Sequence, residues 1–125
     1  MPEEKYHPKF KFLPSKQRLS FEDILRITKN FVSLGVDKIR ITGGEPLLRV
    51  NLTELIGDLS RIDGIKDIAL TTNGVLLAKY ASELKAAGLD RVTVSLDSID
   101  PNEFKTMTGG RGSIDRVIAG IEEAQ

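Results

Sequence analysis

Apolar and polar positions follow two different periods along this chain from about residue 20 onward. Apolar side chains recur every three or four positions in four segments, which predicts amphipathic helices at 21–34, 51–62, 77–87 and 113–125. Between them, three shorter segments alternate apolar with polar or small residues, which predicts strands at 36–42, 67–72 and 91–97. A further short helix is expected after Asp100, because Pro101 suits a first helical position.

Helices and strands alternate in this order, so we expect an α/β fold with parallel strands and right-handed helical crossovers. The spacing of the strand ends fits the βα units of a barrel or of an open doubly wound sheet. Three strands cannot close a barrel of the standard eight units. We therefore expect residues 20–125 to form three βα units of a larger barrel. Residues 1–19, with Pro2, Pro8 and Pro14, predict a loop or disordered lead-in.

Composition excludes several classes of function. Hydrophobic residues make up 40% of the 125 positions, while 18 basic and 18 acidic residues cancel. No bulk charge therefore indicates nucleic acid or membrane partners, and no segment predicts a membrane span or signal peptide. These features fit a cytoplasmic protein. With no cysteine and a single histidine, His7, in a Pro- and Lys-rich stretch, we expect no catalytic residue and no metal ligand in this chain.

The three predicted strands share one unusual feature, which is a polar face opposite an aliphatic one. Side chains two positions apart lie on the same face of a strand. The polar or small faces consist of Lys38, Arg40 and Thr42, then Ala69, Thr71 and Asn73, then Thr93, Ser95 and Asp97. Buried hydroxyls and amides need partners, so this face should line a cavity or meet a ligand. Its polar groups become richer toward the strand C-termini, where α/β folds place their ligand sites.

The turn after the first strand carries an anion where a phosphate-binding loop would carry a cation. Gly43 and Gly44 leave the backbone open to a ligand, and Pro46 keeps Glu45 out of helical angles. A phosphate loop would continue with Lys and Ser or Thr. Glu45 is suited to accept a hydrogen bond from an ammonium group or to bind a metal. Taken alone, these four residues favour an ordinary strand-end turn with an exposed glutamate.

Longer strings carry a resemblance to a known family. Asp37-Lys-Ile-Arg-Ile-Thr-Gly-Gly-Glu-Pro-Leu-Leu-Arg49, Thr71-Thr-Asn-Gly74 and Val94-Ser-Leu-Asp97 resemble the GTP 3′,8-cyclase family (molybdenum cofactor biosynthesis protein A) of the radical S-adenosylmethionine (SAM) superfamily. The resemblance extends from Met1 to Gln125. It implies part of a radical SAM (β/α) barrel. The family's CxxxCxxC motif would lie just before Met1, and the cysteines of its second cluster are absent, so this chain alone is expected to be inactive.

The resemblance also implies ligands and residue roles. The family uses SAM and 4Fe-4S clusters to convert GTP to a cyclic pyranopterin precursor. SAM would be held by Gly43, Gly44 and Glu45, with its ammonium near Glu45, and by Thr71, Asn73 and Ser95. The phosphates of the substrate GTP would meet Lys38 and Arg40. Arg49 is a weaker candidate.

Two other functions stay open. The chain also fits part of another radical SAM enzyme, such as a peptide- or heme-modifying member, or a non-catalytic α/β module that binds a small anion. The Lys38–Arg40 pair favours the cyclase, because a triphosphate needs cations. The lack of cysteine favours the module. The outer strands should leave open sheet edges, through which the chain is expected to form a homo-oligomer.

Overall fold

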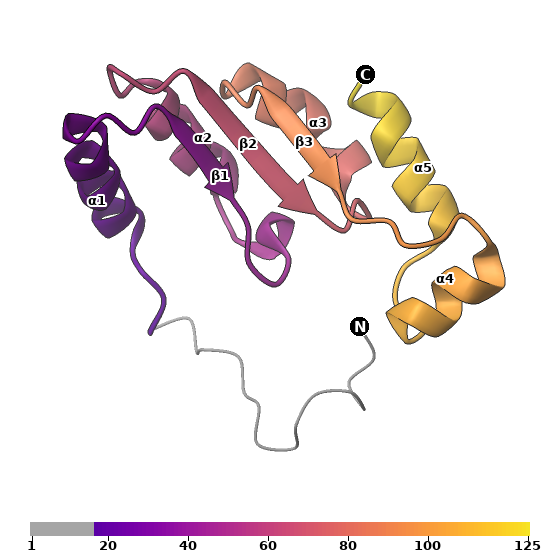
Figure 1. The fold of residues 1–125 in the computed structure, drawn as a ribbon. Helices are drawn as coiled ribbons and strands as arrows, with labels where there is room; N and C mark the ends of the chain where they lie inside the picture. The colour runs from indigo at the N-terminus through magenta and orange to yellow at the C-terminus, as the bar shows by residue number, and fades with distance from the viewer. Residues whose placement is uncertain (1–16) are drawn as a thin grey trace.

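A computed structural model describes residues 17–125, and Figure 1 shows the order of their elements. The strands are β1 (Lys38–Ile41), β2 (Asp67–Thr72) and β3 (Arg91–Val94). The helices are α1 (Phe21–Ser33), the 3-10 turn η3 (Pro46–Leu48), α2 (Leu52–Ser60), α3 (Leu77–Ala86), α4 (Pro101–Thr108) and α5 (Ile114–Glu123). His7 and most of the predicted lead-in lie outside the described residues. None of the described helices is long and apolar enough to cross a membrane.

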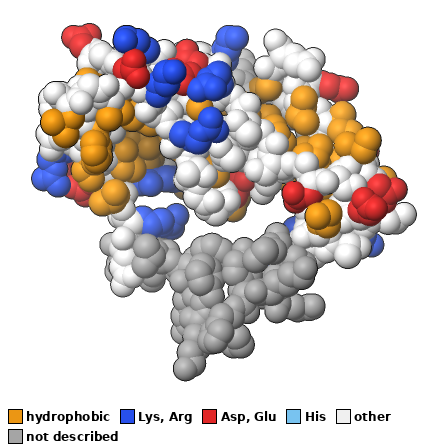
Figure 2. All heavy atoms as spheres, viewed as in Figure 1, with side chains coloured by type: hydrophobic (Ala, Val, Ile, Leu, Met, Phe, Trp, Pro, Cys, Tyr) orange, Lys and Arg blue, Asp and Glu red, His pale blue; other side chains and the backbone are white. Residues whose placement is uncertain are grey.

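The strands form one parallel sheet in the order β1-β2-β3, which confirms the predicted α/β fold with helical crossovers. Arg40 of β1 lies opposite Ala69 of β2, and Thr71 of β2 lies opposite Thr93 of β3. In Figure 1, α2 and α3 lie behind the strands, so the front face of the sheet carries no described helix. Figure 2, seen from the same side, shows Lys and Arg side chains gathered over β1 and β2.

The core lies between the aliphatic strand face and the helices behind it. Ile68 and Leu70 of β2 are almost fully buried there. Their helical neighbours in the same apolar cluster are Leu52, Leu55, Ile56 and Leu59 of α2 and Leu77, Ala81 and Leu84 of α3. A second cluster, Phe104, Ile114 and Val117, packs α4 and α5 together. The outward face of each strand is thereby left to polar side chains, as the alternation predicted.

Helix starts are mostly set as the sequence indicated. Ser20 caps α1 by accepting a hydrogen bond from the Asp23 N–H, and Asp100 caps α4 by accepting from two N–H groups. Asn51 begins α2, but its backbone is left-handed and its side chain makes no capping hydrogen bond. The strands β1 and β3 are shorter than predicted, although Ser95 N–H still donates to the Thr72 carbonyl just beyond β3.

The apolar stripe predicted for the first helix, which is Ile24, Ile27, Phe31 and Leu34, is only partly buried. Ile24 packs against the main core, whereas Phe31 is 51% exposed and Leu34 is 79% exposed. The reason is geometric, because α1 lies beside β1 at the edge of the sheet and covers only one flank of α2 (Figure 1). Hydrophobic periodicity predicts which residues share a helix face, but it does not predict how much of the neighbouring elements is available to cover that face.

Candidate functional site

The candidate site lies at the carboxyl end of the parallel sheet. Gly43 and Gly44 follow β1, Asn73 follows β2, and Ser95 follows β3. Parallel strands bring these three segments to one edge, where their polar groups are mostly exposed. The sequence predicted this gathering. It is also the position at which open α/β sheets and barrels bind ligands.

Glu45 is the best-connected side chain of this edge. Its Oε1 accepts hydrogen bonds from the Leu47 N–H at 3.0 Å and from the Thr72 hydroxyl at 2.7 Å. Its Oε2 accepts from the Asn73 N–H at 2.8 Å. The carboxylate therefore joins the turn after β1 to the turn after β2. An ionised carboxylate has about four acceptor positions, so one remains on Oε2.

Gly43, two residues before Glu45, has open space around it. Its φ of 154° lies in a region that side-chain-bearing residues rarely adopt, and a Cβ built there would meet no atom within 4 Å. Gly44 is exposed as well. A ligand can therefore approach the backbone of both residues closely, which fits the role that the sequence predicted for them.

The turn after β2 is stabilised by the side chain of its first residue, Asn73. Asn73 Oδ1 accepts from the Val75 N–H at 3.0 Å, an Asx-type turn. Gly74 has a φ of 79°, and a Cβ at this position would lie 2.9 Å from Val117 and from Val94. The turn thus needs glycine for both conformation and space. The polar part of Asn73 shapes the rim of the site at the same time.

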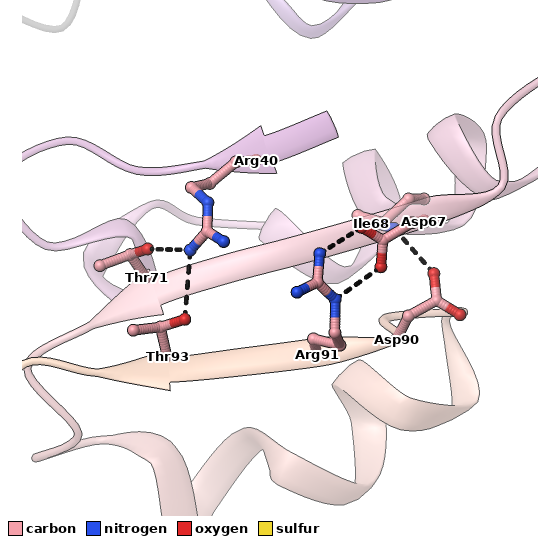
Figure 3. A network of polar contacts seen from close by, with 7 residues as sticks. All are labelled: Arg40, Asp67, Ile68, Thr71, Asp90, Arg91 and Thr93. Carbon is pink, nitrogen blue, oxygen red and sulfur yellow. Dashed lines mark hydrogen bonds and ion pairs between the residues drawn. The ribbon is translucent and has the colours of Figure 1, made fainter. Parts of the chain in front are cut away.

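Arg40 connects the three strands on the open face of the sheet (Figure 3). Its Nη1 donates to the Thr71 hydroxyl at 3.0 Å and to the Thr93 hydroxyl at 3.1 Å. These bonds confirm that the predicted polar side chains share one face. The guanidinium has five N–H donors, so about three remain for another acceptor.

Lys38 lies nearer the other end of this face. Its register partner is Asp67, and among the described residues it forms no hydrogen bond with the other candidates. Asp67 instead binds Arg91 through two hydrogen bonds, of which the bond from Nε is 2.7 Å long (Figure 3). Asp90 accepts from the Ile68 N–H at 2.7 Å and anchors the start of β3.

Electrostatics at this end favour ionised groups. The hydrogen bonds from the Arg91 side chain lower the pKa of Asp67, and the charges of Arg91, Lys38 and Arg40 act in the same direction against partial burial. The same contact raises the pKa of Arg91. Because Asp67 is satisfied by Arg91, neither Lys38 nor Arg40 is tied up in an ion pair within the described chain.

Arg49, the weaker candidate, has a local role. Its Nη2 donates to the Leu19 carbonyl at 2.6 Å, and its guanidinium lies 4.5 Å from the centre of the Phe21 ring. Burial lowers its pKa, as does the charge of Arg18. Arg49 therefore links the segment before α1 to the turn after β1.

Two residues of this network were missed in the sequence. Thr72 shares the alternation of the aliphatic face, so its hydroxyl was not predicted to matter, yet it is 2% exposed and bonded to Glu45. Thr93 was placed on the polar face without a role. A buried threonine at the end of an aliphatic run was the available signal for Thr72, because a buried hydroxyl needs a partner.

The residues present fit a ligand with an ammonium group but not an iron–sulfur cluster. Glu45 has one acceptor position without a protein donor, and the backbone of Gly43, two residues earlier, is open to a ligand. The chain contains no cysteine to supply a thiolate. In the described part of the chain, no three His, Asp or Glu side chains gather as metal ligands.

Comparisons with known proteins show the family to which the chain belongs. The family model described as the radical SAM superfamily matches residues 5–125. A GTP 3′,8-cyclase of Xanthomonas campestris pv. campestris (strain B100) is 55% identical over 113 residues, which are 90% of this chain and 33% of that protein. The GTP 3′,8-cyclase of Acidothermus cellulolyticus is 50% identical over 125 residues, 100% of this chain and 34% of that protein. That of Thermodesulfovibrio yellowstonii is 56% identical over 113 residues, 90% of this chain and 35% of that protein. The chain thus spans about a third of the length of the curated relatives it matches.

Proposed function

The chain belongs to the radical SAM superfamily, and we propose that it forms the SAM-binding part of a GTP 3′,8-cyclase. In this proposal the whole enzyme converts GTP to a cyclic pyranopterin precursor of the molybdenum cofactor, in the cytoplasm. Identities of 50–56% to three cyclases over nearly the whole chain support the cyclase rather than another member of the superfamily.

The Glu45 carboxylate is the observation that carries this proposal. Three protein donors hold it in one orientation, and its remaining acceptor position lies on Oε2. Gly43 and Gly44 leave the neighbouring backbone open. We assign these three residues to the methionine end of SAM, with the ammonium of SAM donating to Glu45. A charge-assisted bond of this kind is stronger than a neutral one.

The remaining SAM contacts come from the next two strands. Thr71 is half-buried and Ser95 is exposed, and both present hydroxyls near the carboxyl end of the sheet. Asn73 shapes the rim between them through its turn. We assign Thr71 and Ser95 to direct contacts with SAM and Asn73 to supporting that wall.

Lys38 and Arg40 form the proposed site for the GTP phosphates. Both are exposed on the open sheet face, and Asp67 forms its ion pair with Arg91 and with neither of them. Arg40 is held by Thr71 and Thr93, with about three N–H donors left for an anion. Because Thr71 is also a proposed SAM contact, the two ligands would bind next to each other.

SAM bound to a reduced 4Fe-4S cluster supplies the radical that abstracts hydrogen in this class of chemistry. The residues of this chain would bind and orient SAM and GTP, and they ligate no cluster, since none is cysteine. We therefore propose that the 125 residues alone have no cyclase activity.

Ligand titration of the full-length protein tests the proposal. We compare SAM with 5′-methylthioadenosine, which keeps the adenosine and the sulfur but lacks the sulfonium charge and the whole amino-acid end, with its ammonium and carboxylate. Glu45→Gln keeps the shape of the side chain and removes its charge, so it should weaken SAM roughly tenfold or more and 5′-methylthioadenosine little. Glu54→Gln, an exposed position in the first turn of α2, is the matched control. Equal effects on both ligands would leave Glu45 as a turn residue.

A further inference from the structure

Thr72 is a buried polar residue at the centre of the contact between the two turns. Of the polar side chains in the described part of the chain, only Thr28 and Thr72 are buried. Thr72 lies on the helix-facing side of β2, behind the proposed ligand site. It is 2% exposed, so a ligand on the open face does not reach it.

The hydroxyl of Thr72 forms hydrogen bonds with both the backbone of its own turn and the Glu45 carboxylate. It accepts a hydrogen bond from the Gly74 N–H at 3.2 Å and donates to Glu45 Oε1 at 2.7 Å. The adjacent Asn73 N–H donates to Oε2 of the same carboxylate. Residues 72–74 thus hold both oxygens of Glu45 from one side, while the Leu47 N–H holds Oε1 from the other.

This arrangement decides which oxygen is left for a ligand. Oε1 has two donors and Oε2 has one, so the free acceptor position lies on Oε2. Without the Thr72 hydroxyl, Oε1 would also have an open position, and the carboxylate would lose its shortest hydrogen bond. The carboxylate would then be free to leave the orientation that its three donors hold.

We propose that Thr72 is a positioning residue for ammonium recognition: it orients Glu45 so that Oε2 accepts from the amino group of SAM. This inference rests on the proposed SAM role of Glu45. It assigns Thr72 no contact with SAM, GTP or the reacting atoms. A purely structural role would instead make Thr72 important for folding without distinguishing ligands that carry an ammonium from those that lack it.

The test extends the titration of the full-length protein with SAM and 5′-methylthioadenosine. Thr72→Val keeps the shape and removes the hydroxyl, and it should weaken SAM roughly tenfold while changing 5′-methylthioadenosine less than about twofold. Thr72→Ser retains the hydroxyl and should stay within about threefold of the wild type for both ligands. Thr28→Val, which removes the other buried threonine hydroxyl, should leave the ratio of the two affinities unchanged.

A double-mutant cycle separates positioning from general packing. In the Glu45→Gln background, Thr72→Val should weaken SAM less than about twofold, because the carboxylate that it orients is gone. Loss of affinity for both ligands alike, or an undiminished effect in the Glu45→Gln background, would overturn the positioning role. If Glu45→Gln itself fails to discriminate the two ligands, the proposed SAM role of Glu45 falls, and the inference falls with it.

Discussion

Replacing Arg40 by alanine is expected to weaken GTP selectively. In the structure, one guanidinium nitrogen spans the sheet to Thr71 and Thr93, and the rest of the group is left for an anion. Removal of the side chain deletes the anion contacts of this fork. Thr71 keeps its place on β2, since its strand pairing to Thr93 does not depend on Arg40.

The expected magnitude follows from the hydrogen bonds that would be lost. A hydrogen bond to a charged group contributes about 1.5–3 kcal/mol, which is roughly 10- to 150-fold in Kd. A phosphate that accepts two of the remaining N–H donors would place the effect toward the upper end. Affinity for SAM should change little, because both threonine hydroxyls are near water and can re-pair with it.

Equilibrium titration of the full-length protein with GTP and, separately, with SAM measures both effects. Arg40→Lys keeps the charge but loses the planar fork, so its GTP affinity should lie between those of the wild type and Arg40→Ala. Arg61→Ala is the matched control, because Arg61 is an exposed arginine at the C-cap of α2 and pairs with Asp58. Its GTP and SAM affinities should equal those of the wild type.

Two results would refute this reasoning. Equal losses of GTP and SAM affinity in Arg40→Ala would show that Arg40 holds the sheet face together and does not recognise phosphate. An unchanged GTP affinity would show that the phosphates bind elsewhere. The proposed phosphate-binding role of Lys38 would then lose its main support as well.

Three further predictions concern the chain itself. The 125-residue chain, anaerobically reconstituted, should bind no iron and make no cyclic product; a stoichiometric 4Fe-4S absorbance spectrum would contradict this. The same chain should associate through the outer edges of β1 and β3, which no strand of residues 17–125 pairs; a concentration-independent monomer mass in light scattering would contradict it. The pKa of Asp67 is lowered in the folded state below its ordinary 3.8, so its stabilising contribution is present above about pH 4 and is lost as pH falls through the lowered value. Urea unfolding of full-length Asp67→Asn should therefore show a shallower loss of stability below roughly pH 4 than the wild type, and parallel curves would refute it.

The sequence predicted the sheet and the shared polar face because both depend on local periodicity. Arg40, Thr71 and Thr93 alternate with aliphatic residues, and alternation alone places them on one side of a strand. The pairing of Thr71 with Thr93 depends on the register between β2 and β3, which the sequence of one strand alone does not show. The carboxyl-end location of Gly43 and Asn73 followed from parallel order, which the helical crossovers impose.

The details of the site depend on contacts between distant segments, which periodicity does not contain. Glu45 accepts a hydrogen bond from the Thr72 hydroxyl, although the two residues are 27 positions apart in the sequence. That contact gives Thr72 a polar role, although its place in the alternation assigns it to the aliphatic face. The exposure of Phe31 has the same kind of cause. The apolar pattern correctly predicted a helix there, but it could not predict how much of that helix would pack against other elements. The local role of Arg49 likewise depends on a distant contact, since its guanidinium donates to a backbone carbonyl 30 positions away.

An experimental structure of the full-length protein with SAM would test the central claim most directly. The account predicts that the amino nitrogen of SAM lies within about 3.2 Å of Glu45 Oε2, beside the Gly43 backbone. It also predicts that Oε1 still accepts from the Leu47 N–H and the Thr72 hydroxyl. A SAM molecule whose amino group contacts other residues, with Glu45 bonded only to protein, would contradict it.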